Sequence, residues 1–203
     1  MMCGKRSRAV NRPSSQYEYM SLDDFEELLA DKPADEKWEL IGGRVVRMMV
    51  GARWEHKRII QNLTVALMNE FRRRGSDCRP FDETFWLKER LLDLACFPDV
   101  MVRCGPLPRD ATSIDDPVVL IEVVSKGSAQ RDRWEKWGLY QRLPSLQHYV
   151  LVERDHLAVD VIDRVEGGFF ERPRLGAIGD ALRLPAIKFE MPLAEIYRDV
   201  IAA

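Results

Sequence analysis

The spacing of apolar residues along the chain predicts alternating helices and strands. Residues 55–73 give the clearest helix, because apolar side chains recur there at three- and four-residue steps. Three arginines, Arg72 to Arg74, and then Gly75 mark the C-terminal end of this helix. The apolar positions of its buried face are Ile59, Ile60, Leu63, Leu67, Met68 and Phe71.

A shorter helix and a hairpin are expected before it. Ser21 is a typical N-cap, acidic residues follow it in the first turns, and Pro33 ends the helical pattern. Residues 38–41 and 44–49 then predict two strands joined by the turn Gly42-Gly43.

Strands dominate from Asp77 onward. A helix is expected over residues 130–143, where Pro144 ends it, and a short helix over residues 193–200. This order predicts an α/β or α+β domain with one mixed sheet. The expected strands are residues 78–88, 97–103, 117–124, 147–153, 157–164 and 168–174, with the turn Asp155-His156 between two of them.

The length and composition indicate one globular domain. A chain of 203 residues with 46% hydrophobic residues can form a core without a disulfide or a structural metal. Residues 1–16 predict a flexible basic tail, and residues 17–203 a single domain. Because no apolar run approaches the roughly 20 residues that span a bilayer, and the N-terminus lacks an apolar signal segment, we expect a cytoplasmic protein.

The charge distribution excludes a generic nucleic-acid coat. The whole chain carries −2, and residues 1–16 carry four basic residues and no acid, which leaves −6 on residues 17–203. Sequence-independent phosphate binding requires a net basic surface. An enzyme whose acids hold a cation against a phosphate is still compatible with this charge.

The four cysteines give no sign of a metal site. Cys3, Cys78, Cys96 and Cys104 form no Cys-x-x-Cys pair, and no histidine stands at zinc-finger spacing from them. Cys96 and Cys104 flank an expected strand, where a cysteine usually serves as a small hydrophobic residue.

Two acids inside apolar strands are the strongest chemical signal. Glu122 has only apolar neighbours in residues 118–124, and Asp99 opens another apolar strand. A carboxylate buried there needs a counter-charge, a proton or a metal. If their strands are adjacent, the two carboxylates converge, and an all-oxygen site of this kind suits Mg²⁺ or Mn²⁺.

Further polar residues extend this candidate site. Asp132, Lys136 and Tyr140 are spaced by four, so they form one stripe of the expected helix. Lys136 either serves a catalytic site or forms a surface salt bridge with Asp132. Glu39, in another apolar strand, is either a structural ion-pair partner or a metal ligand. His56 either packs at the start of the long helix or faces the site.

The sequence lacks the motifs of several common enzyme classes. It has no Gly-x-x-x-x-Gly-Lys phosphate loop, no Gly-x-Gly-x-x-Gly, no Gly-x-Ser-x-Gly and no His-Glu-x-x-His. The commonest nucleotide-binding, serine-hydrolase and zinc-protease functions are therefore excluded. His148 and His156 are expected to be structural or exposed.

Taken in order, these segments resemble a known family. The pairs Pro98-Asp99 and Ile121-Glu122 and the segment from Arg131 to Lys136 carry the most specific part of the likeness. The chain resembles the Uma-two family of restriction-endonuclease-like proteins, within the PD-(D/E)XK nuclease superfamily. The other matching segments are residues 19–27, 38–43 and 143–147, with His56 and Tyr140.

The resemblance implies a restriction-endonuclease-like mixed central sheet flanked by helices, with a Mg²⁺- or Mn²⁺-dependent phosphodiesterase site. Asp99 and Glu122 match the two acidic positions, with Glu39 as a further metal or water ligand and His56 as a neighbour. Val124 stands where the superfamily carries its catalytic lysine, so Lys136 is the expected replacement, with Asp132 and Tyr140 as accessory groups.

The implied activity is hydrolysis of DNA by a metal-activated water. Two other functions stay open at this stage: a catalytically silent binding module that keeps the nuclease fold, and a phosphodiesterase acting on RNA or a small nucleotide. A homodimer is compatible with the resemblance, because cutting both strands of a duplex usually requires two sites. No DNA sequence preference follows from the residues.

Overall fold

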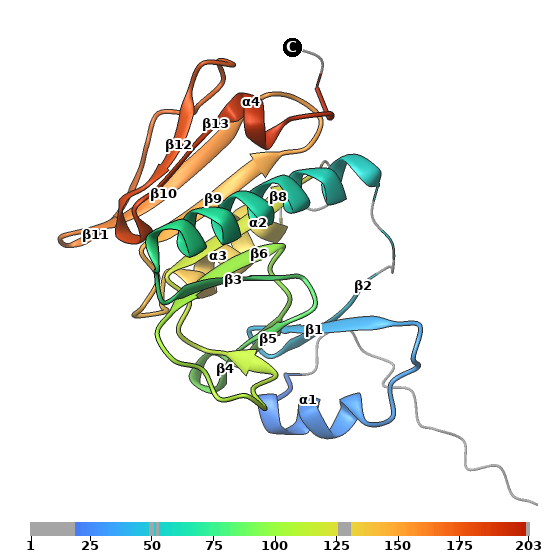
Figure 1. Cartoon of the computed structure of the whole chain (residues 1–203). Coiled ribbons are helices and arrows are strands. Elements are labelled where there is room, and N and C mark those ends of the chain that lie inside the picture. The colour runs from blue at the N-terminus through green and yellow to red at the C-terminus, as the bar shows by residue number, and fades with distance from the viewer. Residues whose placement is uncertain (1–18, 49–50, 52, 126–130, 202–203) are drawn as a thin grey trace, which may run out of the picture.

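The computed structural model describes residues 19–48, 51, 53–125 and 131–201 (Figure 1). The predicted basic tail, residues 1–16, lies outside these described residues. Within them, no helix is both long enough and apolar enough to cross a membrane.

The larger of the two main sheets has six strands in the order β11-β10-β9-β8-β6-β3. Its neighbours are antiparallel except for β8 and β9, which run parallel. The run of apolar residues predicted as a strand over residues 117–124 is the central strand β8, and all six of its residues are buried. The strands are β3 Cys78–Asp82, β6 Val100–Cys104, β8 Val119–Val124, β9 His148–Glu153, β10 Val159–Val165 and β11 Gly168–Glu171.

The second sheet has five strands in the order β2-β1-β5-β4-β7, and a separate hairpin pairs β12 with β13. The α+β class is confirmed, but the strands are divided among these sheets rather than gathered in one. The strands are β1 Lys37–Ile41, β2 Arg44–Met48, β4 Trp86–Glu89, β5 Leu94–Cys96, β7 Ser113–Ile114, β12 Ala181–Leu184 and β13 Phe189–Pro192.

A turn after Asp82 explains why the expected strand over residues 78–88 is two strands. The side chain of Asp82 accepts hydrogen bonds from the backbone N–H and the hydroxyl of Thr84, at 3.1 and 2.7 Å. This turn reverses the chain locally, so β3 joins the larger sheet and β4 joins the smaller one.

The helices lie around these sheets. The predicted helix over residues 55–73 is confirmed as α2 (Trp54–Arg74), which ends at Gly75 in the left-handed conformation with φ 61°. The N-cap role of Ser21 is also confirmed, because its side chain accepts a hydrogen bond from Asp24 N. The other helices are α1 Leu22–Leu29, α3 Trp137–Tyr140 and α4 Leu193–Ile196, with 3-10 turns η1 Arg90–Leu92 and η3 Pro185–Ile187.

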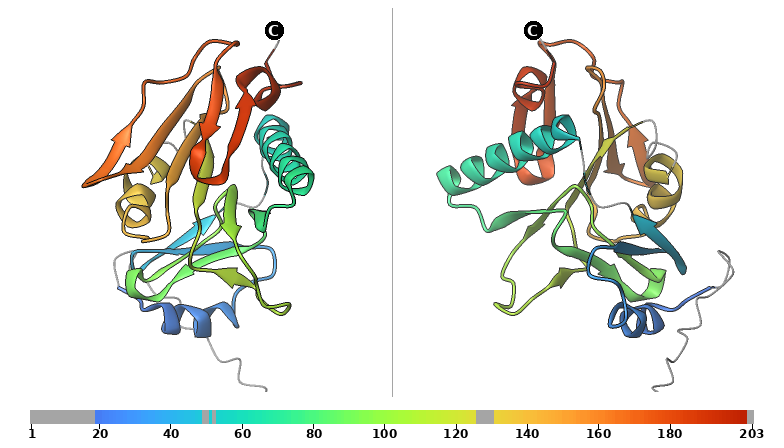
Figure 2. Two further views of the ribbon diagram at one scale, coloured as in Figure 1. Left: turned by 60° about the vertical axis from the view of Figure 1, so that its left-hand side comes forward. Right: turned by 90° about the vertical axis from the view of Figure 1, so that its right-hand side faces the viewer.

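The helix expected over residues 130–143 is shorter and less regular than predicted. It consists of a π-helical turn, η2 (Arg131–Lys136), followed by one turn of α-helix, α3. This segment and α2 lie on opposite faces of the larger sheet (Figure 2). Each face of β8 is therefore covered, as its uninterrupted apolar sequence requires.

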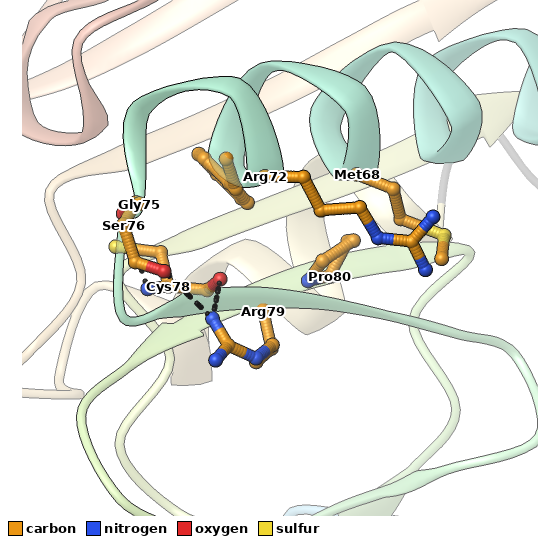
Figure 3. Close-up of a pocket in the computed structure, with 8 residues that line it drawn as sticks. Met68, Arg72, Gly75, Ser76, Cys78, Arg79 and Pro80 are labelled. Carbon is orange, nitrogen blue, oxygen red and sulfur yellow. Dashed lines mark hydrogen bonds between the residues drawn. The ribbon is translucent and has the colours of Figure 1, made fainter.

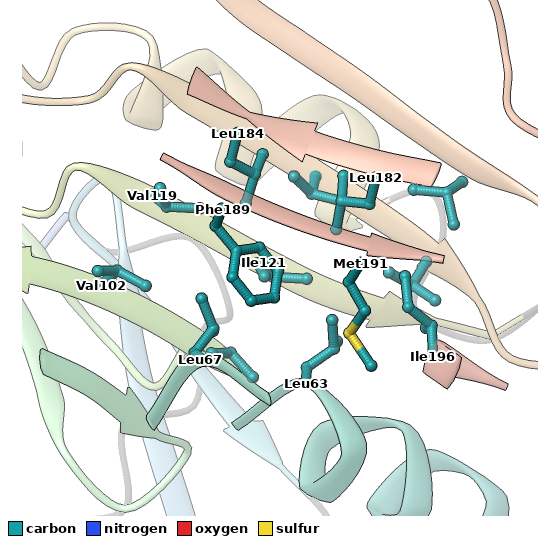
Figure 4. Close-up of a cluster of buried hydrophobic side chains, with 14 of the residues drawn as sticks. Leu63, Leu67, Val102, Val119, Ile121, Leu182, Leu184, Phe189, Met191 and Ile196 are labelled. Atoms are coloured by element: carbon teal, nitrogen blue, oxygen red, sulfur yellow. The ribbon is translucent and has the colours of Figure 1, made fainter. Parts of the chain in front are cut away.

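The main core lies between α2 and the larger sheet (Figure 4). Leu63 and Leu67 of α2 point toward Ile121 of β8 and toward Phe189 and Met191 of the β12-β13 hairpin. The sequence pattern did not indicate this hairpin, which together with α4 closes one side of the core.

A second core joins the two sheets. Met101 and Leu120 of the larger sheet pack with Leu94 and Cys96 of the smaller sheet and with Tyr140 of α3. This core places β1 and β5 beside the end of β8 where Glu122 lies.

Cys78 and Cys104 form a disulfide, so the interpretation of Cys104 as a free, small hydrophobic residue is wrong. The two residues are direct partners in the antiparallel pair β3-β6. Their side chains therefore lie on the same face at neighbouring positions, a relation that sequence spacing does not reveal. Cys96 is free and fully buried, as predicted.

Replacing Leu63 by alanine should lower the free energy of unfolding by about 2–5 kcal/mol, because it leaves a cavity between α2 and β8. Val65, on the same helix and 55% exposed, is the matched control, and its replacement by alanine should cost less than about 0.5 kcal/mol. Urea denaturation followed by circular dichroism measures both, and equal losses would contradict this packing.

Candidate active site

The strand pairing brings Asp99 and Glu122 to the same point of the larger sheet. In the antiparallel pair β6-β8, Val100 is the partner of Ile121, so the register extended by one residue sets Asp99 opposite Glu122. Asp99 Oδ2 also accepts a hydrogen bond of 2.6 Å from the backbone N–H of Val123. The strands are therefore adjacent, but among the described residues the metal-ligating group that contains Asp99 includes neither Glu122 nor Glu39, the two other acids expected to hold the metal.

Asp99 lies in a group of three metal-ligating residues that come from three different elements. His56 near the start of α2, Glu83 in the β3-β4 turn and Asp99 before β6 each offer one ligand atom, and these atoms lie within 4.8 Å of one another. His56 Nε2 is 3.1 Å from Asp99 Oδ1. All three side chains are partly exposed, so solvent or a substrate can reach them. We call His56, Glu83 and Asp99 the outer group.

The charges of the outer group act on the imidazole of His56. Burial lowers the pKa of His56, but the hydrogen bond and charge of Asp99, with the charge of Glu83, outweigh burial and raise this pKa above its ordinary value. The charge of Arg154 acts in the opposite direction and lowers the pKa of His56. Lys57 forms an ion pair with Glu83.

A second, buried set of polar residues lies behind the outer group. Glu122 Oε1 accepts hydrogen bonds from Lys136 Nζ at 2.8 Å and from the hydroxyl of Tyr140 at 3.0 Å. Lys136 and Glu122 are 2% and 3% exposed, so water screens their ion pair very little. Burial holds the pKa of Tyr140 well above its ordinary value, so its hydroxyl stays a hydrogen-bond donor.

Glu39 belongs to the same buried region. Its Oε1 accepts a hydrogen bond of 2.9 Å from Phe97 N, two residues before Asp99, and its Oε2 is buried without a hydrogen-bonding partner among the described residues. Burial and the negative charge of Glu39 raise the pKa of the Cys96 thiol, while the charge of Lys136 lowers it. Cys96 Sγ is 3.3 Å from the Tyr140 hydroxyl, so Cys96 belongs to this buried region as well.

The structure therefore distributes the predicted site residues over two neighbouring layers. Asp99 and His56 lie in the outer group, and Glu39, Glu122, Lys136 and Tyr140 lie in the buried set. We call Glu39, Cys96, Glu122, Lys136 and Tyr140 the inner group. Asp132 is part of the η2 turn, but its side chain lies outside the described part of the chain.

Glu83 is the residue that sequence reasoning missed. It follows β3 in the turn Asp82-Glu83-Thr84, where an acid is unremarkable. Only the pairing of β3 with β6, which sets Asp82 beside Val100, brings Glu83 close to Asp99.

The donor atoms of the site fit a divalent cation. An imidazole nitrogen and two carboxylates form the outer group, and each carboxylate oxygen has lone pairs left after the hydrogen bonds described above. The buried Oε2 of Glu39 adds an acceptor without a donor, which is costly unless a cation or a proton compensates it. Carboxylate oxygens favour Mg²⁺ or Mn²⁺.

The arginines at the end of α2 lie far from this site. Arg72 stands sixteen residues after His56, or roughly 24 Å along the helix axis. Arg73 and Arg74 form ion pairs with Glu70, and Arg74 also donates to the carbonyl of Ile187. These contacts and the favourable position at a helix C-terminus account for their presence.

Most of the chain matches a known protein family. Residues 22–194 match the family model Uma2, described as "Putative restriction endonuclease". Two similar proteins of Synechocystis sp. are both described as uncharacterized. One, slr1290, is 28% identical over 93% of this chain and 97% of its own length. The other, sll1609, is 30% identical over 64% of this chain and 73% of its own length.

A solved structure shares the fold. It is a crystal structure of a protein from Anabaena variabilis ATCC 29413 described as a putative nuclease belonging to DUF820. The TM-score is 0.71 at 17% sequence identity, and the match covers 90% of this chain and 99% of the other. At such low sequence identity, the match shows a shared fold and does not show a shared activity.

Removing one partner of the buried ion pair should destabilise the protein strongly. We expect Lys136→Met to lower the free energy of unfolding by about 3–5 kcal/mol, because it removes the ammonium that lies 2.8 Å from the buried Glu122 carboxylate. The double variant Glu122→Gln with Lys136→Met should recover part of this loss, since neither charge is then left unpaired.

The matched control is the exposed ion pair of Arg44 with Glu135, whose side chains are 45% and 40% exposed. Arg44→Met should cost less than about 1 kcal/mol. If urea denaturation gives Lys136→Met a loss no larger than Arg44→Met, the Glu122–Lys136 pair is not buried as described.

Proposed function

The chain belongs to the Uma2 family of restriction-endonuclease-like proteins, and we propose that it is a Mg²⁺-dependent endonuclease that hydrolyses phosphodiester bonds in DNA. Mn²⁺ is the expected substitute for Mg²⁺, because both cations prefer oxygen ligands. The observation that carries the proposal is the position of Asp99, which belongs to the outer group and also stands opposite the buried Glu122.

The outer group would hold the cation. Asp99 is oriented by two contacts, the backbone N–H of Val123 at 2.6 Å and the imidazole of His56 at 3.1 Å, so its carboxylate keeps one direction. Glu83 completes the group from the other side of β6. When bound, a divalent cation lowers the pKa of water and offsets negative charge on the scissile phosphate.

The inner group would supply the remaining chemistry. Glu122 stands opposite Asp99, and Lys136 and Tyr140 hold its carboxylate by two hydrogen bonds. Lys136 takes the place of a lysine at position 124, and because it is 2% exposed its role is to hold the Glu122 carboxylate in position beside the outer group. Glu39 holds the backbone that leads to Asp99, through its hydrogen bond with Phe97 N.

Basic residues close to the outer group favour a phosphate-bearing substrate despite the acidic chain. Arg154 acts electrostatically on His56, and Arg53 is exposed directly before α2. Part of the negative charge of residues 17–203 belongs to the buried acids Glu39 and Glu122, which are not presented to a substrate. The remaining surface predicts weak DNA binding that weakens further with salt.

The test is nicking of supercoiled plasmid DNA in Mg²⁺ or Mn²⁺. We expect relaxed and linear DNA to appear with the unmodified protein only when the cation is present. Asp99→Ala should lower the rate by on the order of 100-fold or more, because it removes the outer-group carboxylate that stands opposite Glu122. Asp110→Asn, at an exposed position, is the matched control and should leave the rate unchanged.

A second pair of variants tests the cation site independently of cleavage. In wild-type protein, Mg²⁺ should raise the melting temperature, since a ligand that binds only the folded state stabilises it. His56→Ala should reduce this rise, while His156→Ala, an exposed histidine between β9 and β10, should not. Differential scanning calorimetry at several Mg²⁺ concentrations measures both.

The outcomes separate the alternatives. A Mg²⁺-dependent melting temperature without cleavage of DNA or RNA at any salt concentration would favour a silent binding module. Cleavage of RNA alone would make the protein a ribonuclease. If Asp99→Ala kept both the nicking activity and the Mg²⁺-dependent rise in melting temperature, the result would contradict the proposed site.

A further inference from the structure

The disulfide lies on the same pair of strands as the outer group. Cys78 and Cys104 are partners at one end of the β3-β6 ladder, and Asp82 and Val100 are partners at its other end. Glu83 and Asp99 adjoin that second end directly in the sequence. The covalent ring that the disulfide closes, with a sequence separation of 26, therefore contains two of the three outer-group residues.

The strand β3 depends on this link more than an inner strand would. It is the terminal strand of the larger sheet and pairs within that sheet only with β6. Pro80, in the middle of β3, pairs with Val102, whose carbonyl accepts from Val118 N on the β8 side, so the nitrogen of Pro80 faces away from β6 and the ladder loses no hydrogen bond there. The disulfide adds a covalent link to a strand that has one neighbour in its sheet.

Cys78, which is 7% exposed, is among the residues that line a hollow between α2 and β3 (Figure 3). Its volume is about 450 Å³, and its lining includes Met68, Phe71 and Cys78 together with two arginines, Arg72 and Arg79. Arg72 is exposed, and Arg79 donates to the carbonyls of Ser76 and Cys78 at 2.8 Å each. The two guanidinium groups give the hollow a positive charge.

One acid opposes that charge. Asp77 Oδ1 is 4.0 Å from the sulfur of Cys78, and Asp77 is exposed. The two guanidinium groups outnumber the single carboxylate, so the surroundings of the disulfide carry a net positive charge. A positive charge favours the approach of an anionic small molecule and the thiolate form of a cysteine.

We infer that Cys78 and Cys104 form a reversible thiol–disulfide site that controls metal binding by the outer group, and that its reductant is a small anionic thiol of the glutathione type. This inference rests on the proposed function, because it assigns the outer group to a divalent cation. The oxidised pair is the metal-binding form, and the reduced pair is the weakened form.

The chemistry is ordinary thiol–disulfide exchange. A glutathione thiolate attacks Sγ of Cys78, the bond between the two cysteine sulfurs breaks, and Cys104 leaves as a thiolate and takes up a proton. A second glutathione thiolate attacks the glutathione sulfur of this mixed disulfide and releases Cys78, which is protonated in turn. Two electrons pass to the cysteine pair, and glutathione disulfide is the product; the reverse reaction restores the link.

Reduction weakens the metal site through geometry. Once the sulfurs separate, β3 is held to β6 by its backbone hydrogen bonds alone, so Glu83 is less firmly positioned against Asp99 and His56. By thermodynamic linkage, if the disulfide favours metal binding, the metal must favour the disulfide by the same factor. This reciprocity provides a measurement that requires no enzymatic activity.

The first experiment equilibrates the full chain with defined ratios of glutathione and glutathione disulfide, with and without saturating Mg²⁺. The reduced fraction is read by alkylation of free thiols and mass spectrometry. We expect Mg²⁺ to shift the equilibrium constant toward the disulfide by about 5- to 10-fold. His56→Ala, which removes one metal ligand and leaves both cysteines in place, should abolish most of the shift.

The second experiment tests the positive hollow. Arg72→Gln should slow reduction by anionic glutathione by about threefold, because one nearby cation is lost. Reduction by cysteamine, a cationic thiol, should not slow. The ratio of the two rates cancels any effect of the variant on the stability of the fold.

The double variant Cys78→Ser with Cys104→Ser gives the metal-binding readout. It should bind Mg²⁺ about 5- to 10-fold more weakly than the oxidised protein and should not respond to reductant. If this variant does not fold, the redox equilibrium of the unmodified cysteine pair still decides the question.

The results separate this inference from the endonuclease proposal. If Mg²⁺ leaves the redox equilibrium unchanged, the inference that the disulfide controls metal binding is overturned, whether or not the protein cleaves DNA. A Mg²⁺-linked equilibrium in a protein that cleaves no nucleic acid supports the inference and contradicts the endonuclease proposal. If Arg72→Gln slowed the reduction of the disulfide equally for glutathione and for cysteamine, the assignment of an anionic thiol as the reductant would be overturned.

Discussion

An ionised carboxylate in the centre of a sheet is stable only beside a compensating charge, and Glu122 imposes this constraint on the whole molecule. It lies on β8, which is buried along its full length. The compensating charge arrives from Lys136, fourteen residues later, at 2.8 Å. The chain must therefore leave β8, form η2 and return over the sheet so that Lys136 and Tyr140 face Glu122. A fold that failed to do so would leave a buried charge costing several kcal/mol.

The same constraint explains why two sheets meet at the site. Glu39 on β1 reaches the backbone of Phe97 at the end of β5, and the chain then passes through Pro98 to Asp99 and into β6 of the larger sheet. The smaller sheet thus fixes the segment that carries Asp99. Behind this joint the inner group is sealed from water, while in front of it the outer group stays accessible. The buried charges of the inner group hold the surrounding side chains and backbone in fixed positions. The partial exposure of the outer group leaves room for a cation and a phosphate.

Local patterns predicted the regular elements with different success. The helix α2 and the β1-β2 hairpin follow from short-range signals, namely an apolar stripe with three- and four-residue steps and a pair of glycines between strands. The segment over residues 78–88 was harder, because the Asp82 turn that divides it resembles polar positions within a strand. The π-helical turn η2 has no local signature, and its form follows from the demand that Lys136 face Glu122.

Local sequence reveals acids at Glu39 and Glu122 within apolar strands and at Asp99 directly before one, with a lysine on the next helical segment, because a charged residue among apolar neighbours is an exception to the local pattern. Which of these groups become neighbours depends on the packing of the whole chain. Glu83 approaches Asp99, and Cys78 approaches Cys104, through the pairing of β3 with β6. Strand register joins residues far apart in the chain, and it depends on packing across the whole sheet, so no short segment of sequence encodes it.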